Sequence, residues 1–404
     1  MKTFHDPDRF MFDLRQILSQ GRKRVGLLVG AGAPMSIRLD SHGRVSTNGT
    51  PLIPGVDQLT DLVLAGLRDD EHRYAARSIR AEIGARANIE SVLSQVRLLE
   101  KAIGSVQVHG LDARGYAELG QNICDQIGKI VGATLPLERN AFNEMVSWIN
   151  GTLRDHAVEV FSTNYDLLFE EAFEAARAPY FDGFSGGASP FFDPVSVASD
   201  DLPPRWSRLW KLHGSLGWAL EDKGIVRRGG KEFAQLIYPD HLKYDLTQKQ
   251  PYSALFERLR QFLLNPDTLL LAIGFSFRDA HITALVDECL SMNANAALMA
   301  FQFNRVSSEE CACRLAADRP NMSVYASDGA VINGVLGDWR PGETDKGWAQ
   351  IRPTFWGNRN EGDPPQFLLG DFASFARFCA LSQAKEMQRI PAQASSDQKA
   401  GGVS

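Results

Sequence analysis

The chain contains six short apolar runs, each of which predicts a β-strand. They cover residues 24–30, 157–162, 209–212, 268–273, 297–302 and 322–325. Continuous apolar character of this kind is typical of strands buried on both faces. Most of the runs are separated by helical or loop segments, and such alternation is the mark of a parallel sheet covered by helices on both sides. We therefore predict an α/β protein with a doubly wound parallel sheet.

The stretch from residue 56 to residue 155 has a different pattern of hydrophobic and polar residues. Segments with helical periodicity follow one another at 58–68, 71–100, 113–131 and 140–154, with no convincing strand between them. We predict a Rossmann-like α/β domain formed by residues 1–55 and 156–335 and interrupted by a helical insertion at 56–155. Residues 336–404 are predicted to be an irregular C-terminal segment with a last helix at 372–381 and a disordered tail.

Charge and composition narrow the class of protein. The 404 residues are 44% hydrophobic and carry a net charge of −6, so no overall basic field favours direct nucleic-acid binding. No apolar run approaches the roughly 20 residues of a membrane span. The N-terminus has no secretory hydrophobic region, and we therefore expect a cytoplasmic protein with no membrane association.

Five cysteines are scattered along the chain, at positions 124, 289, 311, 313 and 379. An odd, dispersed set argues against a disulfide framework. No CxxC pair is present, so a zinc site of four thiolates lacks its usual spacing, and we expect no zinc and no other metal. Cys311 and Cys313 form the only close pair, and we interpret them as two thiols at a helix start.

Glycine and polar residues that could bind a ligand or take part in a reaction follow the ends of the predicted strands. Gly30, Ala31 and Gly32 follow the first run and would let a dinucleotide pyrophosphate approach the backbone near a helix start. A tight turn between strand and helix explains the same residues equally well. Ser162 to Asp166 follow the second run, and one or more of these side chains could instead cap the next helix.

Three further strand ends carry polar residues. His213 follows the third run beside a glycine, although a lone histidine is more often structural. Gly274 and Ser276 follow the most apolar run and could donate to phosphate, whereas Asp279 could cap the helix after it. Asn304 follows the fifth run, where an amide could meet a ribose hydroxyl. Packing alone does not explain so many polar strand ends, because ligands of open α/β sheets bind at the carboxyl ends of strands.

In their order and spacing, the segments GAGAPMS, STNYD, KLHGS, GFSFRD and FNR resemble the signature of the sirtuin superfamily. They are most similar to the sirtuin-like (Sir2-type) domains of bacterial anti-phage proteins. The resemblance covers residues 25–36, 157–218 and 268–306 and says little about the insertion or the C-terminal segment.

The resemblance implies a role for each matching residue. Asn164 and His213 would be catalytic, with Asn164 near the nicotinamide ribose of NAD. The implied cofactor-binding residues are Gly30, Ala31 and Gly32 at the pyrophosphate, Asp166 at the carboxamide, Gly274 and Ser276 at the phosphates, and Asn304 at the adenosine ribose. Two features depart from the family: residues 214–273 contain no cysteine, and Pro34-Met35 follow the glycine turn.

We therefore expect an NAD glycohydrolase that releases nicotinamide and ADP-ribose, with NAD as substrate and a role in anti-phage defence. An NAD-dependent protein deacylase and a non-catalytic NAD or ADP-ribose sensor are the alternatives. The resemblance also implies partners encoded nearby, such as a HerA-type ATPase or a short Argonaute. Apolar residues on several sides of the segment 89–99 suggest either a homo-oligomer interface or a self-contained bundle.

Overall fold

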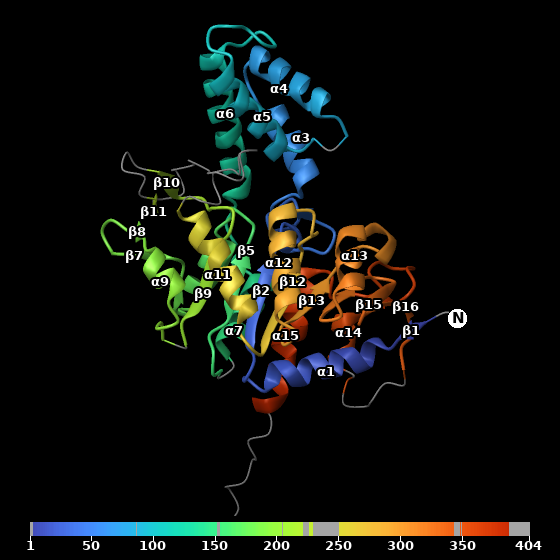
Figure 1. The fold of residues 1–404 in the computed structure, drawn as a ribbon. Helices are drawn as coiled ribbons and strands as arrows, with labels where there is room; N and C mark the ends of the chain where they lie inside the picture. The colour runs from blue at the N-terminus through green and yellow to red at the C-terminus, as the bar shows by residue number, and fades with distance from the viewer. Residues whose placement is uncertain are drawn as a thin grey trace, which may run out of the picture.

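The computed structural model describes residues 3–85, 87–151, 154–203, 205–220, 226–228, 250–342, 348 and 350–387. A ten-stranded sheet forms the centre of the molecule (Figure 1). Its strands, in spatial order, are β1 (Phe4–His5), β16 (Val335–Trp339), β15 (Gly329–Ile332), β14 (Met322–Tyr325), β13 (Ala297–Phe301), β12 (Thr268–Ile273), β2 (Arg24–Val29), β5 (Glu159–Ser162), β9 (Ser207–Lys211) and β6 (Tyr180–Phe181).

The seven strands from β14 to β6 are parallel to their neighbours, whereas β15 pairs antiparallel with both β14 and β16. The chain builds outward from β2 to β5 and β9 and then returns to place β12 on the other side of β2. This reversal confirms the predicted doubly wound α/β fold, and it places the topological switch point beside β2.

Alternate residues of the central strands face two different apolar clusters. In β12, Leu269 and Leu271 belong to one cluster, whereas Leu270 and Ala272 belong to the other. Because both faces are covered, nearly every position of these strands is apolar, and the strands read as unbroken hydrophobic runs.

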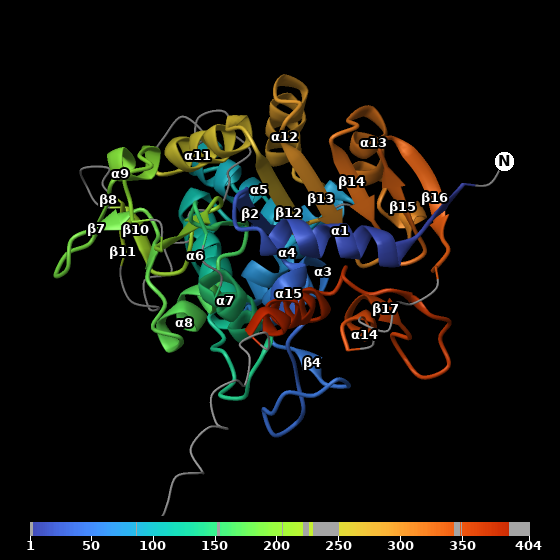
Figure 2. The same ribbon diagram turned by 90° about the horizontal axis from the view of Figure 1, so that it is seen from below.

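Helices cover both faces of the sheet (Figure 2). One face carries α11 (Tyr252–Leu264), α12 (Ala280–Met292) and α13 (Glu310–Asp318). The other carries α1 (Pro7–Ser19), α7 (Ala141–Gly151), α8 (Leu168–Ala175) and α15 (Phe372–Met387). The shorter helices are α2 (Gly32–Met35), α9 (Pro194–Ala198), α14 (Arg352–Phe355) and a 3₁₀ turn at Val306–Ser308. Within the described ranges, no helix has both the length and the apolar character needed to cross a bilayer.

Short strands form three small accessory sheets. They are β10 (Trp218–Leu220), β11 (Val226–Arg228), β8 (Phe191–Phe192) and β7 (Phe184–Ser185); β17 (Trp356–Gly357) and β18 (Gln366–Phe367); and β3 (Arg38–Leu39) and β4 (Thr50–Pro51). The β3–β4 pair lies within the segment between the first glycine turn and the helical insertion.

Four helices of the predicted insertion form a lobe beyond the carboxyl ends of the central strands (Figure 1). The lobe comprises α3 (Val56–Gly66), α4 (Asp70–Ile83), α5 (Ile89–Ala102) and α6 (Ala113–Val131), which pack against one another. The last helix of the insertion, α7, packs instead against α8 and α15 beside the sheet.

Three sequence expectations differ from the structure. The segment 71–100 is two helices, because Gly84, with a φ of +82°, ends α4 before Asn88 caps α5. The helix that follows Gly30 is a single turn, Gly32–Met35. The C-terminal segment is less irregular than predicted, since it contains the end of β16 together with α14, β17 and β18. The predicted disordered tail lies outside the described residues.

Candidate functional site

Five neighbouring strand ends form one level row at the carboxyl edge of the sheet. The last residues of β13, β12, β2, β5 and β9 are Phe301, Ile273, Val29, Ser162 and Lys211, and each is in register with its neighbour in the row. Every motif begins at this row or within two residues after it. The motifs therefore lie along one edge of the sheet, and this edge faces the helical lobe (Figure 1).

Three glycines hold the strand ends of β2 and β12 in close contact. A Cβ atom at Gly30 would lie 2.4 Å from the carbonyl oxygen of Gly274, and one at Gly32 would lie 2.6 Å from the Gly274 Cα. The Gly32 amide also donates to that carbonyl at 3.0 Å. Gly274 has a φ of +64°, which a side chain disfavours. Backbone proximity thus requires glycine at all three positions, whatever ligand binds there.

The loop after β12 alternates between buried and exposed side chains. Phe275 and Phe277 are buried, whereas Ser276 and Arg278 are exposed. Phe277 is held with a φ of +57°, rare for a bulky residue, and its carbonyl accepts from the Thr283 hydroxyl at 3.0 Å. The buried rings therefore anchor the loop and leave Ser276 at the surface of the edge.

Asn164 ties the β5 end to the glycine turn. Its Nδ2 donates to the carbonyl oxygen of Gly30 at 3.0 Å, and its backbone amide donates to the Ser162 hydroxyl at 3.2 Å. The bond to Gly30 fixes the side-chain amide and leaves its oxygen, Oδ1, as the acceptor at this edge. Neighbouring Ala31 is exposed at the same turn.

His213 joins the end of β9 to the loop after β12, although β2 and β5 lie between these two strands. Its Nε2 lies 3.1 Å from Oδ2 of Asp279, and both side chains are mostly buried. The other carboxylate oxygen of Asp279 accepts from the backbone amides of His281 and Ile282 at 2.9 and 3.1 Å, which caps α12. The capping interpretation of Asp279 is therefore confirmed, but the same carboxylate also contacts the predicted catalytic histidine.

Asp166 lies beneath the edge in a group of buried charges. Its Oδ1 accepts from the Leu168 amide at 3.1 Å, and its backbone carbonyl accepts from the Lys211 ammonium. Lys211 also lies 3.5 Å from Oε1 of Glu170. Burial raises the pKa of Asp166, and it raises the pKa of Glu170 to about 7, partly opposed by Lys211.

Asn304 lies at the β13 end of the row and is exposed. Its Nδ2 donates to Glu309 Oε1 at 2.9 Å, and its carbonyl accepts from the Ser327 amide. Beside it, the guanidinium of Arg359 lies 3.7 Å from the ring centroid of Phe303 and donates to the Phe303 carbonyl. The C-terminal segment thus reaches this end of the row, a contact for which the sequence gives no signal.

The structure links most of the predicted site residues to one another. Asn164 bonds to the Gly30 turn, Gly30 touches Gly274, and the loop that begins at Gly274 ends at Asp279, the partner of His213. Asn304 and the buried Asp166 take no direct part in these contacts. Sequence reasoning missed the Asp279–His213 pair, because nothing in the spacing of 66 positions indicates that the two residues meet.

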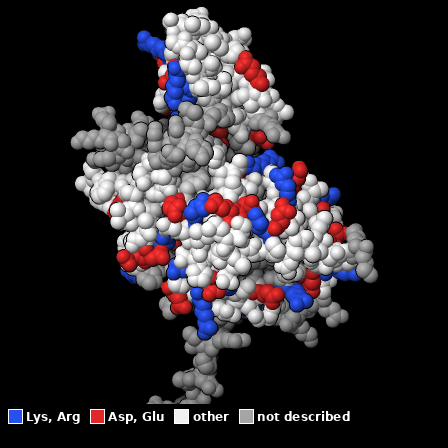
Figure 3. All heavy atoms as spheres, viewed as in Figure 1, with Lys and Arg blue, Asp and Glu red and all other residues white. Residues whose placement is uncertain are grey.

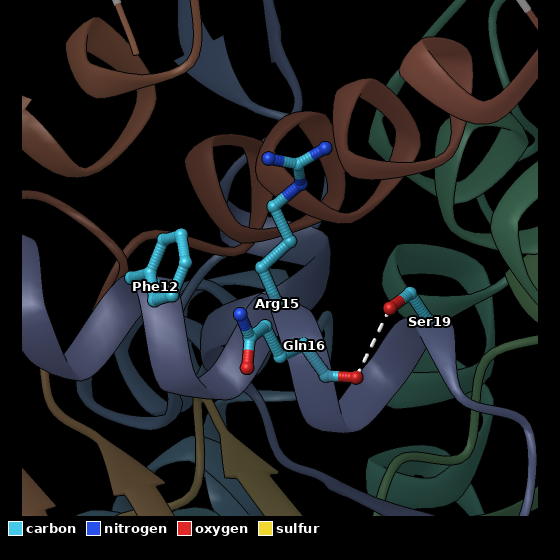
Figure 4. Close-up of a pocket in the computed structure, with 4 residues that line it drawn as sticks. All are labelled: Phe12, Arg15, Gln16 and Ser19. Carbon is cyan, nitrogen blue, oxygen red and sulfur yellow. Dashed lines mark hydrogen bonds between the residues drawn. The ribbon is translucent and has the colours of Figure 1, made fainter. Parts of the chain in front are cut away.

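Away from this edge, the described residues also form a cavity. A cavity of about 180 Å³ lined by Phe12, Arg15, Gln16 and Ser19 lies on α1, away from the row of strand ends (Figure 4). On the face in Figure 3, acidic and basic side chains are interspersed, with no broad area of one sign. No group of three or more His, Cys, Asp or Glu residues in the described ranges is arranged to hold a metal ion. The described cysteines are free thiols, with Cys311 and Cys313 in the first turn of α13, as predicted.

Residues 158–319 match the family described as the SIR2-like domain. The match spans less than half of the chain and includes four of the five strand-end motifs; the first glycine turn precedes it. It confirms the predicted resemblance at the level of this domain family. No curated protein sequence matches the chain.

Several solved structures are distantly similar. One described as the structural basis for the mechanism and regulation of Sir2 enzymes has 11% identity and a TM-score of 0.37, covering 95% of this chain and 100% of that one. A mutant Sir2 homologue with ADP-ribose gives 11% and 0.37, covering 93% and 98%. A Sir2 homologue with NAD gives 12% and 0.32, covering 74% and 86%. These likenesses are too distant to assign a ligand or an activity.

Proposed function

We propose that this protein is an NAD glycohydrolase that cleaves the bond between nicotinamide and ribose and transfers the ribose to water. The observation that carries the proposal is the linkage of Asn164, the Gly30 turn, the Gly274 loop and His213 at one edge of the sheet. The SIR2-like domain match over residues 158–319 supports NAD as the substrate.

The proposed residues suit this reaction. Nicotinamide leaves NAD as a neutral molecule from a cationic ring, so its departure requires no general acid. The ribose then gains oxocarbenium character, as in glycoside hydrolysis, and a nucleophile must be positioned against it. A neutral imidazole at His213 can accept a proton from water or from a ribose hydroxyl. The acceptor oxygen of Asn164 can orient that water or hydroxyl without adding charge.

The remaining site residues are proposed to bind the substrate. The pyrophosphate is proposed to lie against the backbone of the Gly30–Gly32 turn and the Gly274 loop, where Ala31 and Ser276 are exposed. Asn304 is proposed to contact the adenosine ribose, and Asp166 to contact the carboxamide. Because Asp166 is only 3% exposed, its carboxylate would reach a ligand only from beneath the edge.

Product analysis with and without an acetylated peptide separates this proposal from its alternatives. A glycohydrolase releases nicotinamide and ADP-ribose in equal amounts without peptide. A deacylase releases nicotinamide only with the peptide and forms an acetylated ADP-ribose, whereas a sensor binds NAD and leaves it intact. We also expect elemental analysis to find no stoichiometric zinc; one zinc per chain would favour the deacylase.

We further propose that residues 1–55 and 156–335 form the catalytic domain and that residues 56–155 are an insertion that gates it. Contacts at the two ends of the lobe support gating. Gly55 lies against Met35, just after the glycine turn, and Gly132 lies against Leu216, three residues after His213.

The resemblance to anti-phage proteins supports a defensive role in which NAD is destroyed on a trigger, with a HerA-type ATPase or a short Argonaute as candidate partners.

A further inference from the structure

We propose that Asp279 is a positioning residue that fixes the tautomer of His213, so that Nδ1 is the ring nitrogen that accepts the proton during NAD cleavage. The catalytic consequence rests on the proposed function, whereas the tautomer itself does not.

The two residues of the pair come from strands that are not neighbours in the sheet. Asp279 belongs to the loop after β12, and His213 follows β9, with β2 and β5 between them. Neighbouring strands lie roughly 4.8 Å apart, so these two strand ends are about 14 Å apart. Residues from both ends must therefore reach over the Gly30 turn and Asn164 to meet at 3.1 Å. Asp279 thus contacts one of the two proposed catalytic side chains.

The orientation of the carboxylate is determined by the helix it caps. Oδ1 accepts from two backbone amides, those of His281 and Ile282. Oδ2 is thereby aimed at Nε2 of His213. An ionised carboxylate only accepts hydrogen bonds, so Nε2 must carry the proton. In neutral imidazole the other nitrogen, Nδ1, is then the acceptor.

In the proposed step, one bond to C1′ of the ribose forms as another breaks. A proton passes from water to Nδ1 of His213, the water oxygen bonds to C1′ of the ribose, and the C1′–N bond breaks with its electron pair leaving on nicotinamide. His213 becomes an imidazolium, which the Asp279 carboxylate stabilises and which later releases its proton to solvent. Asp279 itself stays ionised throughout.

Two substitutions that keep the cap separate positioning from mere structure. In Asp279→Asn, the amide oxygen must accept from the helix amides, so the NH₂ group faces Nε2 of His213. Nε2 must then accept, which moves the ring proton to Nδ1 and removes the base. In Asp279→Ser, the hydroxyl caps the helix but is too short to reach His213, so either tautomer can form. Asn, Asp and Ser are nearly equivalent caps, so neither change should alter thermal unfolding much.

We expect the Asn variant to lose roughly 10²- to 10⁴-fold in kcat and the Ser variant only roughly tenfold, with KM for NAD little changed in both. A purely structural role predicts the reverse order, because Asn is the closer replacement for Asp. An Asn variant as active as the Ser variant, or more active, would overturn the proposal.

Nitrogen-15 NMR of histidine-labelled protein tests the tautomer without any activity. The His213 signal is identified by its absence from His213→Gln. We expect the Nε2–H form in the wild type and the Nδ1–H form in Asp279→Asn; an Nδ1–H form in the wild type would contradict the inference. If the wild type shows the expected tautomer but does not cleave NAD, the proposed function fails and the assignment of Asp279 stands.

Discussion

At the residue scale, existing hydrogen bonds decide which atoms of the candidate site are available for chemistry. The Asn164 amide is oriented by Gly30, and the His213 ring is oriented by Asp279. In the proposed reaction, both side chains would therefore already be positioned, with little rotational freedom left to lose on the way to the transition state.

The buried charges around Lys211 give a pH-dependent stability that can be measured. Glu170 has an ordinary pKa of 4.5, and burial raises it to about 7 in the folded chain. Between these two values the unfolded chain loses a proton that the folded chain retains. The contribution of Glu170 to stability is thus fully present below pH 4.5 and is lost as the pH rises toward 7.

We therefore expect Glu170→Gln to gain stability relative to the wild type as the pH increases from about 4.5 to 7. The relative change should be on the order of 1 to 3 kcal/mol. Denaturant unfolding of both proteins at several pH values measures it, and comparing the variants cancels the titration of other groups. A stability difference that is the same at all pH values would show that Glu170 does not titrate in this window.

Sequence reasoning placed the candidate residues at the ends of strands but did not predict the contacts between them. Glycines and polar residues after apolar runs can be recognised because ligands of α/β sheets bind there. The Asp279–His213 pair and the Arg359 contact with Phe303 could not be predicted, since each depends on how far a loop reaches across the sheet. The resemblance predicts that Asp166 contacts the carboxamide, whereas its burial depends on α8 and Lys211, which pack around it and which the sequence pattern does not reveal.

At the element scale, the sheet positions the candidate residues, and the helical lobe lies beyond the same edge (Figure 1). The level row of strand ends follows from parallel pairing in register, and the apolar runs predicted all five of these strands. The two-residue edge strands β1 and β6 were not predicted, because they carry too few apolar positions to form a recognisable run. The longer, non-edge strands β15 and β16 were not predicted either.

A hydrogen bond connects the lobe to the candidate site. Tyr165, between Asn164 and Asp166, donates from its hydroxyl to Glu90 Oε1 at 3.3 Å, in the first turn of α5. The carbonyl of Tyr165 accepts from the Leu216 amide at 2.9 Å, which joins the same residue to the segment after His213. A movement of α5 would therefore displace Tyr165 and, through it, the segment that follows His213.

We expect Tyr165→Phe to lower NAD cleavage roughly 10- to 150-fold, because a hydrogen bond to a charged group contributes about 1.5 to 3 kcal/mol. Glu90→Gln is the matched control: it removes the charge but keeps an oxygen that can accept from Tyr165, so its rate should stay closer to that of the wild type. Steady-state nicotinamide release measures both. Unchanged kinetics in Tyr165→Phe would mean that the lobe does not act through this bond.

At the scale of the whole molecule, the structure changes the argument for assembly. The apolar residues of α5 that suggested an interface are mostly buried inside the lobe, as shown by exposed fractions of 0 to 1% for Ile89, Val92, Leu93 and Val96. Their wide apolar arc is therefore explained by packing within the bundle. Exposed apolar side chains remain on the lobe at Tyr74, Leu98 and Val106.

We still predict a homo-oligomer, with these exposed residues of the lobe contributing to its contacts. Sedimentation across a concentration series should show association, and a triple change of Tyr74, Leu98 and Val106 to serine should weaken it. A wild-type protein that is monomeric at every concentration and fully active would contradict the prediction.

The central claim is that Asn164 and His213 cleave NAD at the row of strand ends, and the rate of nicotinamide release by purified protein tests it most directly. The account predicts release of nicotinamide and ADP-ribose by the wild type and a loss of at least about 10²-fold in His213→Ala and in Asn164→Ala, with unchanged thermal unfolding. His156→Ala, at the amino end of β5, is the matched control and should retain wild-type activity. Near-native rates in both site variants, or no cleavage by the wild type, would contradict the account.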